Sequence, residues 1–335
     1  MRAGLIVVLL AACGGGGGEG DGGAGDATIG ADADPLDPMT LADTGLYLED
    51  GVTLADGVRP YTPRWHLWSD GADKGRWIQL PGDIDSTDMD YWVYPVGTKA
   101  WKEFSLDGTR IETRLLWKQT DTTWFMRAYV WNAEQTQAFA APDGLTDAMG
   151  TTHDVPAPED CQKCHNRMPD KLLGFTALQL DYDPPGSSDV SLDDLVTGGE
   201  LSAPITRTDP DYYFPMPADP TGTIAPALGY LHGNCGGCHH PQSDVHDVVG
   251  LELRLTTAFT GDWADTPPYQ TAVNQQTELT VITAGLDKIV DPGNPTGSIV
   301  HYRMNRRGQY QMPPLATEEV DTDAVAAVDA WINDL

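Results

Sequence analysis

Apolar and aromatic residues come in short runs over the first half of the chain and at helical spacing near its end. The runs YWVYPV (91–96), RIETRLLWK (110–118) and TWFMRAYVW (123–131) are rich in β-branched and aromatic residues, which favour strands. SLDGTR (105–110) supplies Asp107-Gly108, a dipeptide that favours a tight hairpin turn. The pattern predicts an antiparallel β domain in this half.

The C-terminal segment DTDAVAAVDAWINDL (321–335) has the spacing of an amphipathic helix. Asp321 or Thr322 is a suitable N-cap. The apolar face is formed by Val325, Val328, Trp331 and Ile332. A second helical run, APALGYLHGN (225–234), precedes a cysteine pair, and a third, capped near Ser298, includes Met304. The second half is therefore predicted to be mainly helical, and the fold class is α+β with two domains.

The N-terminus reads as an export signal. Arg2 is followed by an apolar run, Leu5 to Leu10, that is too short to span a bilayer. The ending Leu-Ala-Ala-Cys resembles the lipobox of bacterial lipoproteins, which implies that Cys13 is lipidated after cleavage of residues 1–12. An ordinary signal peptide with a chance cysteine is the alternative. Gly14 stands where an aspartate would resemble an inner-membrane retention signal, so an outer-membrane location facing the periplasm is favoured.

Composition sets the domain limits and excludes some partners. Residues 14–40 are mostly glycine, alanine and aspartate, which predicts a flexible tether. The remaining length exceeds one typical domain, so we expect a β domain at 41–205 and a second domain at 206–335. The net charge of −30 makes nucleic acid an improbable partner. It suits basic partners, or simply gives a solvated acidic surface, and no segment after the leader predicts a membrane span.

The five cysteines follow a pattern. Apart from Cys13, they form two Cys-x-x-Cys-His units. The first motif is Cys161, Cys164 and His165, and the second motif is Cys235, Cys238 and His239. Two intervening residues place both thiols on one turn, where they can bond one porphyrin, and the next histidine can ligate the iron. The prediction is two covalently bound haem c groups; a four-thiolate zinc site and a redox dithiol are the alternatives.

Around the second motif the chain resembles a small c-type cytochrome domain. The resemblance implies that the first and last helices of the domain cross, with Trp331 near Gly229 and Tyr230. It also implies a second axial ligand, usually a methionine in the loop before the last helix. GQYQMPPLA (308–316) offers Met312, with two prolines to stiffen the loop, and Met304 is the rival.

The distal ligand of the first haem is left open by the sequence. Met216, in YYFPMPADP (212–220), and His153 are candidates, as is no ligand at all. Met168 lies only three residues after His165, which is too close to reach across a porphyrin ring.

A longer resemblance covers most of residues 60–335. Tyr61, Pro63 and LWSDGADKGRW (67–77) are followed by YPVGTKAWKEF (94–104), IETRLLW (111–117), YVWNAEQTQA (129–138) and the two motifs. This order is similar to that of an uncharacterised group of secreted bacterial dihaem cytochrome-c-like proteins, which has no assigned reaction. The segments also look similar to lysine-cross-linked haem enzymes that oxidise hydroxylamine. That likeness implies an open first iron, with Lys99 or Lys102 as the cross-linking residue; surface lysines are the alternative.

Three functions are consistent with these features. Electron transfer between exported redox partners needs only two haems, an axial methionine and an anchor. A haem enzyme, peroxidase-like or acting on a small nitrogen compound, would use an open first haem and the second as relay. A module that binds a saccharide or a partner protein would use the eight of ten tryptophans that lie in the β domain, although so many in one domain are typical of a core. These eight are Trp65, Trp68, Trp77, Trp92, Trp101, Trp117, Trp124 and Trp131.

Overall fold

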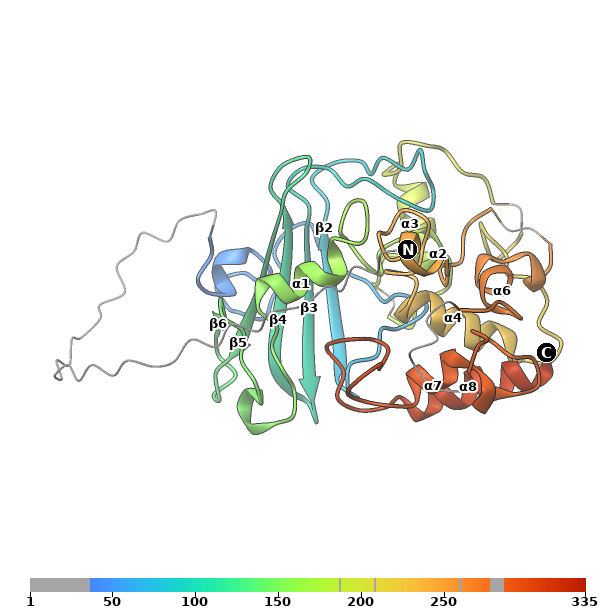
Figure 1. Ribbon diagram of the computed structural model, residues 1–335. Helices are drawn as coiled ribbons and strands as arrows, with labels where there is room; N and C mark the ends of the chain where they lie inside the picture. Colours follow the sequence, from blue (N-terminus) through green and yellow to red (C-terminus); the bar gives the residue numbers. More distant parts are fainter. Residues whose placement is uncertain (1–36, 187, 208, 259–260, 278–285) are drawn as a thin grey trace, which may run out of the picture.

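The computed structural model describes residues 37–335 except 187, 208, 259–260 and 278–285. Cys13 and most of the predicted tether lie outside the described residues. One antiparallel sheet of six strands, in the order β1 to β6, forms the first half (Figure 1). The strands are β1 Val58–Pro60, β2 Asp73–Gln79, β3 Lys99–Leu106, β4 Thr109–Lys118, β5 Trp124–Trp131 and β6 Ala138–Ala140. The predicted β-rich first half is confirmed.

The hairpin between β3 and β4 forms where the sequence predicts it. Asp107 and Gly108 both have positive φ angles, 49° and 77°, as a tight two-residue turn requires. The prediction for 91–96 is wrong as a strand. Only Val93 makes a bridge there, with Asp85, because Trp92 and Tyr94 pack into the core and Tyr94 N donates to the Asp170 carboxylate instead of to a strand.

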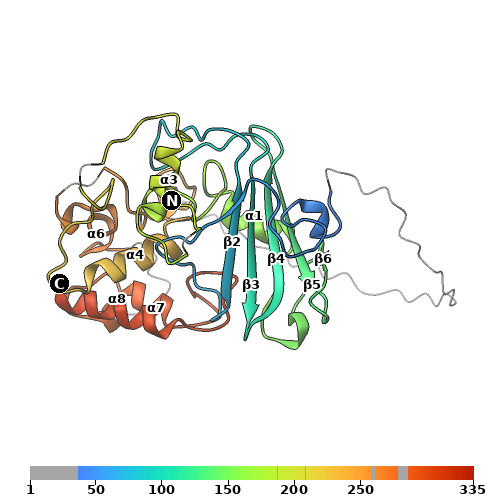
Figure 2. The same ribbon diagram turned by 180° about the vertical axis from the view of Figure 1, so that it is seen from behind.

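The two faces of the sheet are covered by different segments. Helix α1 (Pro158–His165), which carries the first motif, lies across one face and contacts β5 (Figures 1 and 2). The opposite face is covered by the segment around η1 (Ala42–Thr44). Trp101 and Trp131 are buried beneath that segment with Leu41 and Leu46. All eight tryptophans of this half are buried or half-buried, as expected of a core rather than of an exposed platform.

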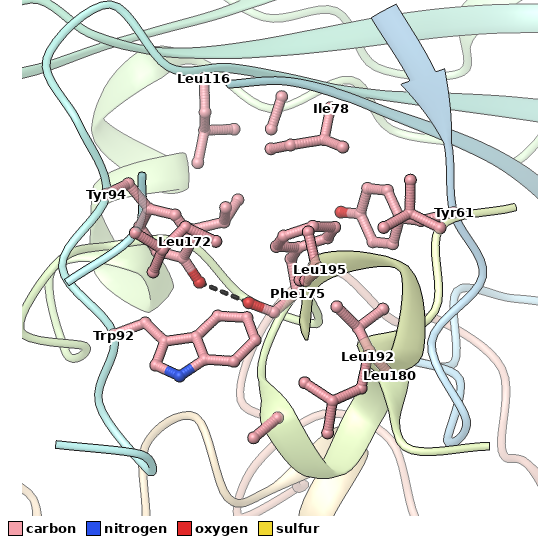
Figure 3. Close-up of a cluster of buried hydrophobic side chains, with 14 of the residues drawn as sticks. Tyr61, Ile78, Trp92, Tyr94, Leu116, Leu172, Phe175, Leu180, Leu192 and Leu195 are labelled. Atoms are coloured by element: carbon pink, nitrogen blue, oxygen red, sulfur yellow. Dashed lines mark hydrogen bonds between the residues drawn. The ribbon is translucent and has the colours of Figure 1, made fainter. Parts of the chain in front are cut away.

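A hydrophobic cluster on the α1 face links the sheet to the chain after the first motif. Ile78 and Leu116 project from the strands toward Phe175 (Figure 3). The other wall comes from α2 (Ala177–Leu180) and α3 (Leu192–Thr197), which contribute Leu180, Leu192 and Leu195. Tyr94 donates its hydroxyl proton to the Phe175 carbonyl, so the aromatic centre is also tied by a hydrogen bond.

The regular elements that the described residues form in the second half are all helices, although most of the described part of this half lies in loops and turns. It contains α4 (Ile224–Asn234), α5 (His246–Val249), η3 (Trp263–Asp265), α6 (Pro267–Ala272), η4 (Pro295–Gly297), α7 (Ile299–Met304) and α8 (Thr322–Asp334). Helix η2 (Ala148–Gly150) belongs to the first half. Asp321 caps α8 by accepting a hydrogen bond from Ala324 N, and α8 packs on α4. Trp331 lies fully buried in the same cluster as Tyr230.

Trp65, from the other half of the chain, packs directly against Gly229. A Cβ atom added at Gly229 would collide with the Trp65 indole, and one at Gly233 would lie 2.8 Å from the Trp65 carbonyl oxygen. The two glycines therefore permit the close approach of the segment before β2 to α4. The contact between Trp65 and α4 joins segments on the two sides of the predicted domain boundary. That boundary stays a prediction.

A buried ion pair fixes the chain just after the first motif to the sheet. Lys118 and Asp170 are 1% and 8% exposed, and Nζ lies 2.7 Å from Oδ2. Asp170 also accepts hydrogen bonds from Tyr94 N at 2.6 Å and Trp124 Nε1 at 3.0 Å. The Asp170 carboxylate thus accepts hydrogen bonds from three segments of the chain, through Lys118, Tyr94 and Trp124.

Asp170→Asn is expected to reduce the free energy of unfolding by about 3–5 kcal/mol, because it leaves the Lys118 ammonium buried without its counter-ion. Chemical denaturation measures this. The double variant Lys118→Met/Asp170→Asn should recover part of the loss, since it removes the stranded charge. A loss below about 1 kcal/mol in the single variant would contradict a structural role for the pair.

Candidate functional site

Both Cys-x-x-Cys-His motifs line one cavity of about 1270 Å³ between the sheet and the helical half. This volume exceeds the ~300–1,000 Å³ of an ordinary small-molecule site. Much of its wall is apolar, with residues from both halves that include Leu116, Val155, Leu172, Leu251, Ile289 and Met304. The cavity is therefore large and apolar, and all four thiols of the two motifs reach it.

The first motif lies on α1. Pro158 occupies the first turn, where a missing amide proton costs nothing, and Glu159 and Asp160 follow at the positive end of the helix. The spacing of three residues brings Cys161 and Cys164 to one face of the helix. His165 ends it and donates from Nδ1 to the Lys171 carbonyl at 2.6 Å, which orients the ring.

The second motif occupies the turn that follows α4. The Cys235 carbonyl accepts hydrogen bonds from Cys238 N at 3.0 Å and from His239 N at 2.9 Å, so the motif forms one helical turn. His239 Nδ1 is buried and has no hydrogen-bond partner among the described residues, although the nearby Leu251 backbone tends to raise the pKa of the ring.

The two motifs touch through their neighbouring residues. His240 is fully buried, donates from Nε2 to the Arg167 carbonyl at 3.1 Å, and accepts from the Tyr91 hydroxyl at 3.2 Å. Arg167 also pairs with Asp244. Cys164 lies close enough to Cys238 to raise the pKa of the Cys238 thiol, in addition to the larger effect of burial. The sequence does not reveal this proximity, because the motifs are some 70 residues apart and nothing local reports their contact.

The state of the thiols bears on the alternatives to haem. No disulfide joins them, and burial raises the pKa of Cys161 and Cys238 to about 11 and that of Cys235 to about 12. Redox-active Cys-x-x-Cys pairs instead have lowered thiol pKa values. The hypothesis that either motif is a redox-active dithiol is therefore disfavoured. Within the described ranges no three His, Cys, Asp or Glu side chains gather as in a metal site, and the four-thiolate arrangement needed for zinc is not formed.

The two histidines are in the form that can ligate iron. Burial lowers the pKa of His165 to about 4, against the opposing effect of the Lys171 carbonyl. Burial, with the Arg303 charge, likewise lowers the pKa of His239 to about 4. Both imidazoles are therefore neutral at pH 7, as metal ligation requires. Buried neutral thiols, neutral imidazoles and a large apolar cavity fit a pair of covalently attached porphyrins.

The candidate methionines are placed differently. Met312 lines the cavity, and its backbone N donates to the Arg303 carbonyl at 2.9 Å, which holds the loop beside the second motif. Met304 is buried in the helical core and also reaches the cavity wall. Met216 packs against the same core but is not part of the cavity lining, and neither is the buried Met168. The structure thus brings Met312, but not Met216, to the cavity.

The sheet contributes polar groups near the first motif that sequence reasoning did not combine. Glu112 is fully buried and accepts from Arg114 Nε at 3.0 Å and from His153 Nε2 at 2.7 Å. Burial alone would raise the pKa of Glu112, but Arg114 and His153 together lower it. Lys102 also lines the cavity, whereas Lys99 points to the other face and donates to the Thr44 carbonyl at 2.7 Å. The sequence did carry a signal for Glu112 and Arg114: side chains alternate between the two faces of a strand, so these two residues of β4 share one face.

The segment LWSDGADKGRW holds the loop behind Met312. The Asp70 carboxylate accepts hydrogen bonds from Glu318 N at 3.0 Å and Glu319 N at 2.9 Å, and Trp68 Nε1 donates to the Glu319 carbonyl at 3.1 Å. Trp68 N donates to the Asn234 side chain, at the end of α4, at 2.7 Å. This segment therefore connects the β half to two parts of the helical half. One is the end of α4, just before the second motif, and the other is the loop that follows Met312.

Asp70→Ala is expected to lower the free energy of unfolding by about 1–2 kcal/mol more than a matched control, since it removes charge-assisted acceptors from two amides. Asp107→Ala is that control: Asp107 is exposed and its φ of 49° equals that of Asp70, so both variants carry the same backbone strain. Thermal denaturation compares the two. Equal shifts would show that the contact with the loop contributes no stability.

The comparisons with known proteins give no match for this chain, whether with protein-family models, with curated proteins or with solved structures. In the part of the chain that the structure describes, no helix has the length and apolar character to cross a membrane.

Proposed function

We propose that this protein is a lipid-anchored dihaem c-type cytochrome that transfers electrons between exported redox partners. The observation that carries the proposal is that both Cys-x-x-Cys-His motifs open into one large apolar cavity. When bound, the haem groups supply one-electron chemistry at iron. The chain's own residues attach, orient and shield them.

The thiols of the two motifs would form the thioether bonds, and His165 and His239 would be proximal ligands. In the proposed assignment the second half is a cytochrome c-like domain with Met312 as the second ligand of its iron. The position of Met312 in the cavity, on a loop tied to α7, supports this role. The apolar walls would limit water around both irons, which favours the less charged, reduced state.

The shared cavity supports electron transfer within the chain. The contact of Arg167 with His240 joins a residue two positions after the first motif to the residue that directly follows the second motif. Electrons would thus enter at one haem and leave at the other without a change of fold. Cys13 as a lipidated residue, an outer-membrane location and export to the periplasm complete the proposal.

A haem enzyme is the second candidate, and the residues near the first motif favour it. Met216 does not reach the cavity, and the polar groups Glu112, Arg114 and Lys102 do line it or border it. His153 also lines the cavity, but its Nε2 is engaged by Glu112. An iron at the first motif with an open face would bind small molecules, and the second haem would relay electrons.

Carbon monoxide distinguishes the two candidates. The reduced, matured protein is examined by optical spectroscopy before and after the gas is added. If the c-type bands do not change, both irons hold two protein ligands and plain electron transfer is supported. If about half of the haem absorbance shifts, one iron is open, and the enzyme becomes the better account.

The partner should be basic. Exposed Asp154 and Glu318 stand at the cavity wall with Asp70, and Asp154 raises the pKa of Glu318. The rate of electron transfer to a basic small cytochrome is expected to fall about tenfold or more as ionic strength rises from ~0.01 M to ~1 M, because screening removes the attraction. Stopped-flow spectroscopy measures the rate. An acidic small cytochrome is the control and should react faster as salt is added; a salt-independent rate with the basic partner would contradict electrostatic docking.

A further inference from the structure

Three cations stand side by side on the sheet face that borders the cavity. Arg76 on β2 is in register with Lys102 on β3, which is in register with Arg114 on β4. All three line the cavity. Like charges directly opposite on neighbouring strands repel one another and destabilise a sheet. We call these three residues the cationic row.

Within the described ranges, one member of the row has a counter-ion and the other two do not. Arg114 forms a two-pronged ion pair with Glu112, through Nε at 3.0 Å and Nη2 at 2.5 Å. Arg76 is 6% exposed, and within the described residues its guanidinium has no hydrogen-bond or ion-pair partner. Lys102 has only the face of Phe104, with Nζ 4.7 Å from the ring centroid. In the described part of the chain, Arg76 and Lys102 are therefore left without a carboxylate partner.

Such an arrangement is costly without a ligand. The Arg76 side chain is largely buried at the cavity wall, and the donors of its guanidinium have no partner among the described residues. Burial, followed by the charges of Arg76 and Arg114, lowers the pKa of Lys102 well below its usual range. The chain has 50 acidic and only 20 basic residues, so carboxylates are abundant. Among the described residues none of these carboxylates pairs with Arg76 or Lys102, and this is the feature that calls for a ligand.

We propose that Arg76 and Lys102, with Arg114 beside them, form a binding site for a carboxylate or small oxyanion at the cavity wall. A planar guanidinium and an ammonium on adjacent strands offer the forked and single donors that a carboxylate accepts. The oxyanion has two sources: a propionate of a porphyrin held in the cavity, which rests on the proposed function, or a free small anion such as formate or nitrite.

The site is tested on the matured protein with Arg76→Met, Lys102→Met and the control Lys99→Met. Lys99 is on the same strand as Lys102, but its ammonium lies on the opposite face. Two readouts are used: calorimetric titration with formate, and the propionate bending band of the resonance Raman spectrum. Arg76→Lys keeps the charge and is expected to retain part of the binding.

Two results support the site and identify its occupant. Formate binding that Arg76→Met and Lys102→Met each weaken by about tenfold or more indicates a free anion, as expected for the loss of a charge-assisted hydrogen bond. No formate binding, together with a propionate band that shifts in these two variants and not in Lys99→Met, indicates the porphyrin.

The site is refuted if neither the titration nor the Raman band differs between wild type and the two variants. Matured protein that contains no haem would refute the proposed function instead. The formate titration would still decide whether the cationic row binds an anion.

Discussion

Replacing both Cys161 and Cys164 by serine is expected to remove one of two covalently bound haems from the matured protein. A serine hydroxyl does not form the thioether that anchors the porphyrin. The iron and haem contents should fall from two to one per chain, because the second motif is left intact. Intact-mass spectrometry and the pyridine haemochrome spectrum measure both quantities.

The reciprocal variant and a distant one serve as controls. Cys235→Ser/Cys238→Ser should remove the other haem and, with it, any signal from methionine ligation. Cys13→Ser should keep both haems and lose the lipid. If the first pair of substitutions leaves the haem content unchanged, or releases bound zinc instead, the assignment of the first motif is wrong.

Met312→Ala is expected to lower the reduction potential of the second haem by about 100 mV or more, within the ~0.8 V range over which axial ligands set haem potentials. Met312 lines the cavity, and the residue whose carbonyl it bonds, Arg303, is close enough to His239 to lower the pKa of that ring. Loss of the thioether removes a ligand that stabilises reduced iron. Potentiometric titration gives the shift, and the low-spin methionine absorbance should disappear.

Met304→Leu and Met216→Leu are the matched controls, since both keep an apolar side chain of similar volume. Neither should change the methionine absorbance. If Met304→Leu abolishes it and Met312→Ala does not, the buried methionine of α7 is the ligand. If no variant changes the spectrum, the second iron is not ligated by methionine.

Several elements could be predicted because their signals are local. The Asp107-Gly108 hairpin, the Asp321 cap and the apolar face of α8 depend on residues within one turn or one helix. The segment at 91–96 misled because aromatic and β-branched residues also suit an extended loop packed on a core, as Trp92 and Tyr94 do. Tertiary packing, not intrinsic preference, decides such runs.

The individual motifs could be predicted as well, but not their common cavity. The approach of Trp65 to Gly229, the contact of His240 with Arg167, and the register of Arg76 with Lys102 all join distant parts of the chain. Pairing of strands across a sheet and packing of separate segments leave no periodic trace in the sequence. A methionine followed by proline occurs at both 216 and 312, and only the fold distinguishes their surroundings.

The haem content of the matured protein tests the central claim most directly. Intact mass, iron analysis and the optical spectrum of the reduced protein are measured on one preparation. The account predicts two covalently attached haems per chain with c-type absorbance bands. Protein that matures with no haem, or with zinc bound by the four thiols, would contradict it.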